Sequence, residues 1–222
     1  MTDTALTDWL ADTLGHSPTD MALFTRALTH PSTGDPDYQR LEFLGDRVLG
    51  LIVSSWLFDL HPSEPEGLLN SRLAALVSRQ TCAEIGREIG VAAHIYLGKQ
   101  AKDDGGGDSD NVLGDVVEAL IGALYRDSGF DAARSFVFRK WESRVEAMDS
   151  APQHPKSALQ EWAAANKCKP PVYSIAERSG PAHNPHFTIR VEIPNRAEAL
   201  AEGSSKQEAE TAAAQALLEK LT

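Results

Sequence analysis

The stretch QRLEFLGDRVLGLIVSSWLF (Gln39–Phe58) places apolar residues three and four positions apart, which is typical of a helix that buries one face. Within it, Glu42 and Asp46 lie four residues apart, so a helix places both carboxylates on the same face. Their neighbours Leu41, Leu44 and Val48 are apolar. The stretch therefore predicts a long helix that carries two acids at an apolar surface.

A second stretch, VLGDVVEALIGALY (Val112–Tyr125), repeats this pattern with Asp115 and Glu118 three residues apart. Burying an unpaired carboxylate is costly, so each acid pair needs an arginine, a proton or a metal ion. Either pair alone is explained as salt-bridged or helix-capping acids. Two pairs in two apolar helices favour one shared all-oxygen site, which suits magnesium or manganese better than zinc. The chemistry predicts a metal-dependent phosphoryl hydrolase.

Outward from these stretches, the first 147 residues show helical periodicity without β-like alternation. The run DDGGGDSDN (Asp103–Asn111) predicts a mobile acidic loop that lacks the ligand spacing of a calcium-binding loop. Helices are expected over residues 4–14, 20–29, 37–60, 67–89, 111–127 and 130–147.

Beyond a short polar segment with prolines, residues 148–154, the pattern changes. A helix over Lys156–Asn166 is followed by the strand-like runs VYSIAE, HFTIRVEI and RAEALAE, and an alanine-rich helix spans about Ser205–Leu221. The expected fold is α+β: an all-α domain over residues 1–147, a linker, and a small α-β-β-β-α domain over residues 155–222.

The net charge of −11 argues at first against a nucleic-acid partner, whose binding surface is usually basic. Residues 1–151 hold 13 Lys and Arg against 24 Asp and Glu, whereas residues 152–222 hold 8 against 8. The acidity therefore belongs to the first domain, where cations are wanted. Phosphate binding by the second domain has to come from a local basic patch.

The remaining composition indicates a cytoplasmic protein with no membrane partner. The start MTDTALTDWL lacks the plan of a signal peptide, and the most apolar stretch, Val48–Phe58, is too short to span a bilayer. Cys82 and Cys168 match no zinc or redox spacing. We expect no structural disulfide and no small-molecule cofactor.

Three motifs resemble blocks of the ribonuclease III family: LEFLGDRVL (Leu41–Leu49), ALTHPS (Ala27–Ser32) and GDVVEALIGALYRDSGF (Gly114–Phe130). The resemblance runs from about Phe24 to the end of the chain. It implies that Glu42, Asp46, Asp115 and Glu118 bind the metal, with Asp46 and Glu118 catalytic. It also implies a homodimer in which two subunits form a valley for duplex RNA.

The resemblance assigns roles to further positions and shows two departures. Phe43 is expected to pack into the partner subunit, although an ordinary core aromatic is the alternative, and Glu66 matches an acidic position that lines the valley. Gln39 stands where many members have glutamate. Arg47 stands where a small residue is usual; it is either a phosphate contact or a solvated arginine.

The second domain contains KSALQEW (Lys156–Trp162), GPAHNPHF (Gly180–Phe187) and GSSKQEAETAAA (Gly203–Ala214), which resemble the double-stranded-RNA-binding domain. Ser157, Gln160 and Glu161 would face one minor groove, His183 the next, and Lys206 the phosphates between them. The alternatives are a capping serine, a plain loop histidine, or a metal at His183 and His186, for which two ligands are too few. Gln207 replaces a lysine and Ala201 a glycine, which predicts weaker phosphate attraction.

The sequence thus predicts a homodimeric, magnesium-dependent endoribonuclease for double-stranded RNA, with manganese able to substitute. Two metal ions would activate water for in-line attack and leave 5′-phosphate and 3′-hydroxyl ends, with ribosomal RNA precursors as expected substrates. Two alternatives are a catalytically silent RNA-binding dimer, against which all four acids speak, and a hydrolase of small nucleotides, against which the RNA-binding domain speaks.

Overall fold

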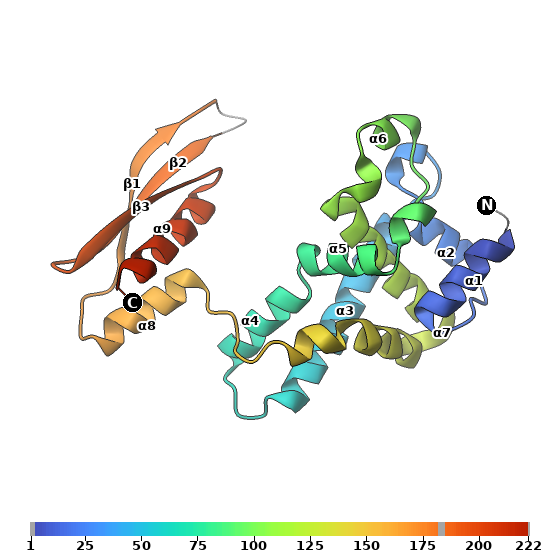
Figure 1. The fold of residues 1–222 in the computed structure, drawn as a ribbon, viewed down its shortest axis with the longest axis horizontal. Coiled ribbons are helices and arrows are strands. Elements are labelled where there is room, and N and C mark those ends of the chain that lie inside the picture. Colours follow the sequence, from blue (N-terminus) through green and yellow to red (C-terminus); the bar gives the residue numbers. More distant parts are fainter. Residues whose placement is uncertain (1–2, 182–184, 222) are drawn as a thin grey trace. The chain divides into compact units, whose positions relative to one another are not determined.

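The protein forms two compact units that divide after Ala151, each with its own hydrophobic core. The structure, a computed structural model, describes residues 3–181 and 185–221 (Figure 1). Within these residues no helix is long and apolar enough to cross a membrane. The fold is α+β, with a helical first unit and a second unit built on a three-stranded sheet.

The first unit follows the helical periodicity of its sequence. Its α-helices are α1 (Asp3–Leu14), α2 (Met21–Ala27), α3 (Gln39–Leu60), α4 (Glu66–Leu76), α5 (Arg79–Glu88), α6 (Lys99–Asp103) and α7 (Asp110–Glu146). Short 3-10 turns lie at Pro31–Thr33, Val91–His94 and Gly106–Asp108. The last of these turns and α6 occupy part of the segment that the sequence predicted as a loop.

The prediction of a single helix over residues 67–89 is wrong, because the helix is interrupted between α4 and α5. Ser78 caps α5, its hydroxyl accepting a hydrogen bond from the Thr81 backbone N–H at 3.2 Å. The indole of Trp141 donates to the carbonyl of Leu76 at 2.7 Å and so satisfies the end of α4. Apolar periodicity continues across this break, which is why it did not reveal the two helices.

The predicted break between residues 127 and 130 is present as a kink in α7. Gly129 has φ 83° and ψ −176°, a backbone conformation that interrupts the helix and that glycine adopts without strain. The kink lets α7 pack against the rest of the unit along both of its parts.

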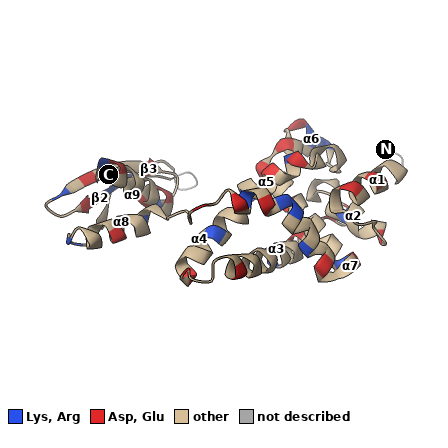
Figure 2. Cartoon of the chain, turned by 60° about the horizontal axis from the view of Figure 1, so that its bottom comes forward, with Lys and Arg blue, Asp and Glu red and all other residues tan. Residues whose placement is uncertain are grey.

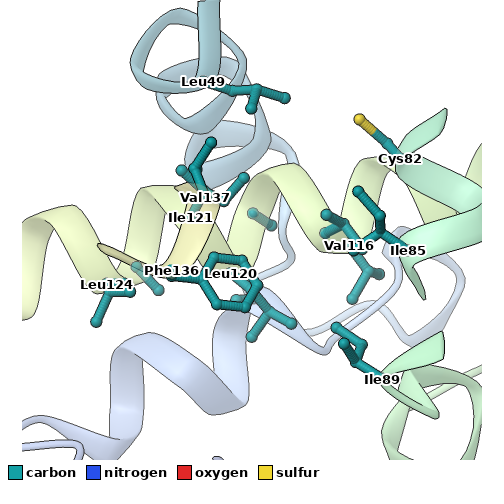
Figure 3. Packing of buried hydrophobic residues seen from close by; sticks show 14 of the residues in the cluster. Leu49, Cys82, Ile85, Ile89, Val116, Leu120, Ile121, Leu124, Phe136 and Val137 are labelled. Carbon is teal, nitrogen blue, oxygen red and sulfur yellow. The ribbon is translucent and has the colours of Figure 1, made fainter. Parts of the chain in front are cut away.

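The core of the first unit is centred on the first part of α7, which is buried on nearly every side. Figure 3 shows α7 residues Val116, Leu120 and Ile121 between Leu49 of α3 and Ile85 of α5. A helix that is apolar all round is expected in a core, so Asp115 and Glu118 stand out as the acids on this segment.

The second unit packs two helices against one face of an antiparallel sheet. Its elements are α8 (Pro155–Ala165), β1 (Val172–Ser179), β2 (His186–Ile193), β3 (Ala197–Gly203) and α9 (Lys206–Leu221), with strand order β1-β2-β3. Ile189, Val191 and Ile193 alternate along β2 and face Leu159 and the small residues of α9 in the core. The order of elements agrees with the expected α-β-β-β-α domain.

Candidate active site

The candidate site lies where α3 crosses α7, and two glycines permit that crossing. A Cβ on Gly45 would lie 1.7 Å from the backbone oxygen of Glu118, and one on Gly122 would lie 2.2 Å from that of Leu41. The helix backbones therefore touch directly at this point. Because Glu42 and Asp46 flank Gly45, and Asp115 and Glu118 precede Gly122, the contact brings the two acid-bearing faces together.

Three of the four acids repel one another in a partly buried setting. Burial, together with the charges of Glu42 and Asp115, raises the pKa of Glu118 to about 7. Burial and the Asp115 charge raise the pKa of Glu42, and burial raises that of Asp115. Carboxylates that burial and like charge both disfavour provide a strong attraction for a cation.

The fourth acid, Asp46, makes a different contact. Its carboxylate forms an ion pair with Arg47, whose guanidinium also lies 5.5 Å from the centre of the Phe43 ring. Arg47 lies beside Asp46, and its side chain is 67% exposed to solvent. Arg47 is one of the two departures from the family pattern, and its guanidinium pairs with the carboxylate of Asp46, a proposed metal ligand.

Three residues that the sequence did not single out surround the acids. The hydroxyl of buried Tyr38 donates to Asp115 at 3.2 Å, and the thiol of Cys82 lies 3.9 Å from a carboxylate oxygen of Glu118. The positive charge of Arg79 lowers the pKa values of Glu42, Asp115 and Glu118, against the other effects. These residues come from separate segments, so no spacing in the sequence could have indicated them.

The donor set fits a hard divalent cation, but the side chains are not arranged around one. Among the described residues, no three His, Cys, Asp or Glu side chains are placed so that they could hold a metal ion. In this arrangement the Asp46 carboxylate is paired with Arg47. All four acids offer the carboxylate oxygens that magnesium prefers.

Phe43, Glu66 and Gln39 lie on the same unit. The ring of Phe43 is 66% exposed, so the alternative of an ordinary core aromatic is excluded. Glu66 is the first residue of α4 and accepts a hydrogen bond from Asn70 at 2.6 Å. Gln39 begins α3 and is exposed. The interface role of Phe43 and the valley role of Glu66 stay predictions.

In the second unit, the predicted RNA-binding residues of α8 and α9 are exposed. Ser157, Gln160 and Glu161 lie on α8, and Lys206 is the first residue of α9. Ser157 is not the capping residue, because the imidazole of His154 accepts the hydrogen bond from the Lys156 backbone N–H. His183 lies outside the described residues. His186 pairs with Glu202 at 3.0 Å.

Crossed acid-bearing helices followed by an α-β-β-β-α unit define the class: a nuclease joined to a double-stranded-RNA-binding module. Residues 20–144 match the family described as "Ribonuclease-III-like", and residues 155–221 match "Double-stranded RNA binding motif". The chain belongs to the ribonuclease III family and is a metal-dependent endoribonuclease for double-stranded RNA.

Relatives agree along the whole chain. "Ribonuclease 3" of Zymomonas mobilis is 59% identical over 221 residues, covering 100% of this chain and 90% of the relative. "Ribonuclease 3" of Dinoroseobacter shibae is 47% identical, covering 93% and 92%. A solved nuclease domain of ribonuclease III from Campylobacter jejuni is 33% identical with a TM-score of 0.61, covering 63% of this chain and 98% of that domain.

Proposed function

We propose that the chain cuts both strands of duplex RNA by magnesium-dependent hydrolysis, leaving 5′-phosphate and 3′-hydroxyl ends. The observation that carries this proposal is the backbone contact at Gly45 and Gly122, which brings the two acid-bearing helix faces together. Magnesium ions bound there would activate water for in-line attack and neutralise charge at the leaving oxygen. Manganese offers similar chemistry with the same oxygen ligands.

Each residue of the site has a proposed task. Glu42, Asp46, Asp115 and Glu118 hold the metal, and Asp46 and Glu118 act closest to the reacting phosphate. Tyr38 donates to Asp115 and so fixes one carboxylate oxygen, which orients the other. Arg79 lies near enough to offset part of the negative charge before a cation arrives. Asp46 has to leave Arg47 in order to bind metal.

We further propose that the active form is a homodimer in the cytoplasm that processes ribosomal RNA precursors and other transcripts. Support for the dimer comes from the exposed face of α3, on which Phe43, Leu51 and Phe58 are 66%, 58% and 71% exposed. The solved nuclease domain from Campylobacter jejuni is described as flexible in a "region involved in dimer formation". Apolar surface of this kind marks an interaction site more often than a solvated face.

In the second unit, Ser157, Gln160, Glu161, His183 and Lys206 are proposed to contact the duplex. Exposure of the residues on α8 and α9 supports this, since the described residues of the set are available to a ligand. Ser157, Gln160 and Glu161 would contact the minor groove, and Lys206 would contact the phosphates.

The test is incubation of the full chain with a long RNA duplex, with magnesium and with a chelator. We expect fragments with 5′-phosphates only when magnesium is present. Binding of the duplex without cleavage under both conditions would instead identify a silent RNA-binding dimer. Hydrolysis of nucleotides together with no effect on the duplex would identify a small-molecule hydrolase.

A further inference from the structure

Glu210 on α9 lies between two lysines of the second unit. One of its carboxylate oxygens is 2.6 Å from the ammonium nitrogen of Lys156, and the other is 3.6 Å from that of Lys206. The side chain of Glu210 is only 16% exposed, whereas those of Lys156 and Lys206 are 32% and 60% exposed. A partly buried carboxylate thus neutralises two cations that remain accessible to solvent.

The position of Lys156 is fixed from a second side. Its ammonium nitrogen lies 5.0 Å from the centre of the Tyr173 ring, an attractive cation–π distance. The hydroxyl of Tyr173 is buried and has no hydrogen-bond partner among the described residues. The ring and the carboxylate together hold the Lys156 ammonium group close to Glu210. Both lysines lower the pKa of Glu210, the Lys156 hydrogen bond most strongly, so the carboxylate is charged at neutral pH.

Charge is compensated across the rest of the unit as well. Residues 152–222 carry eight cations and eight anions, and Figure 2 shows both kinds along its helices and strands. On the sheet, for example, Arg190 pairs with both Glu192 and Glu198. The two lysines at Glu210 belong to the elements that carry the proposed RNA-binding residues, so their charge matters most for phosphate attraction.

We propose that Glu210 limits the affinity of the second unit for duplex RNA, because its carboxylate competes with RNA phosphates for Lys156 and Lys206. This inference rests on the proposed RNA-binding role of α8 and α9. A phosphate that approaches these ammonium groups must share them with the carboxylate and is repelled by it. Binding by the second unit is then weak for any duplex. A duplex that the nuclease unit holds only weakly therefore dissociates before it is cut.

The test compares two variants of the full chain with the same change in charge. Glu210→Gln frees both lysines. Glu219→Gln on the same helix removes an exposed acid that accepts a hydrogen bond from Gln215 at 2.9 Å and has no ion pair among the described residues. Dissociation constants for a labelled RNA duplex are measured with chelator present over a salt series. We expect Glu210→Gln to bind the duplex roughly 5- to 10-fold more tightly than Glu219→Gln at 0.15 M salt. The slope of log affinity against log salt concentration should also be steeper, by an amount that corresponds to about one to two additional phosphate contacts.

Equal or weaker binding by Glu210→Gln than by Glu219→Gln would overturn the inference. Weaker binding would mean that the carboxylate positions the lysines for phosphate instead of competing with it. Melting curves show whether both variants fold. If Glu210→Gln does not, Glu210→Ala removes the same charge with a residue that favours helix, and the same comparison is made.

A third variant separates this inference from the proposed function. Lys206→Gln is expected to weaken duplex binding. If it leaves binding unchanged, the proposed RNA-binding surface is wrong. If it weakens binding while Glu210→Gln does not strengthen it, only the role of Glu210 is wrong. When two long duplexes of unrelated sequence compete for cleavage, Glu210→Gln is expected to cut the duplex that the parent cuts more slowly at a rate closer to that of the other duplex.

Discussion

At the scale of single residues, the surroundings of Glu118 strongly disfavour its charged form. It sits on the most buried part of α7, with the Cys82 thiol 3.9 Å away and with Glu42 and Asp115 as like-charged neighbours. Burial and the charge of Glu118 raise the pKa of Cys82 to about 12, so the thiol stays neutral and adds no further charge. A charged Glu118 in these surroundings lowers the stability of the fold unless a cation binds beside it. A metal ion at this position would therefore be bound favourably.

We expect Glu118→Gln to bind duplex RNA about as well as the parent but to cleave it at least ~100-fold more slowly. The amide keeps the volume but removes the anion, and magnesium prefers carboxylate oxygen. Single-turnover cleavage and filter binding on the same duplex give the two values. Full cleavage activity would remove Glu118 from the catalytic set, and loss of binding with an intact fold would make it a binding residue.

The same substitution is expected to leave the metal-free protein at least as stable as the parent, although it removes a proposed metal ligand. Removing one carboxylate relieves repulsion with Glu42 and Asp115, so with chelator at pH 8 the variant melts no lower than the parent. Magnesium then raises its melting temperature less, because the ion binds the variant more weakly.

The two acid pairs, whose role as metal ligands stays a prediction, could be found in the sequence because acids at helical spacing in apolar helices are a local pattern. Their partners could not. Tyr38 and Arg79 reach the acids through the packing of separate helices, and the pairing of Asp46 with Arg47 depends on side-chain conformation. The sequence also left open whether Phe43 was buried, which only the position of its ring on α3 decides.

At the scale of elements, the crossing of α3 and α7 determines the separation of the two acid pairs. The residues that permit it are small rather than charged, and a glycine in a helical pattern does not by itself indicate a close approach. Periodicity predicted the long helices and the three strands. It missed the short elements between α5 and α7, because a single turn is too short to show a period.

Gly45→Ala is expected to destabilise the first unit and to abolish cleavage. Its new Cβ would overlap the Glu118 backbone oxygen, so the helices must separate, and overpacking of a tight core typically costs about 1–3 kcal/mol or more. Gly50→Ala on the same helix is the control, since a Cβ there meets nothing within 4 Å. It should be neutral or stabilising by up to about 1 kcal/mol. Urea unfolding of both variants measures the difference, and equal stability would contradict a backbone contact at Gly45.

At the scale of the whole molecule, the first unit leaves a row of large apolar side chains on α3 uncovered in one subunit. If a second copy covers Phe43, Phe43→Ala shifts the monomer–dimer equilibrium toward monomer, since truncating a buried aromatic costs about 3–5 kcal/mol. Sedimentation over a concentration series measures the shift. Leu200→Ala, which truncates a residue 53% exposed on β3 of the second unit, is expected to leave the equilibrium unchanged. A dimer of parental strength in Phe43→Ala would place the interface elsewhere.

The contact between Gly45 and Gly122 has a consequence for the order in which the protein becomes active during synthesis. The ribosome makes the chain from its N-terminus, so α3 with Glu42 and Asp46 emerges well before the part of α7 on which the crossing depends. A nascent chain that ends before Gly122 holds only part of the crossing and cannot hold the acids in place. If the four acids form the catalytic site, we therefore expect the growing protein to be unable to cut RNA until α7 has been made through Gly122.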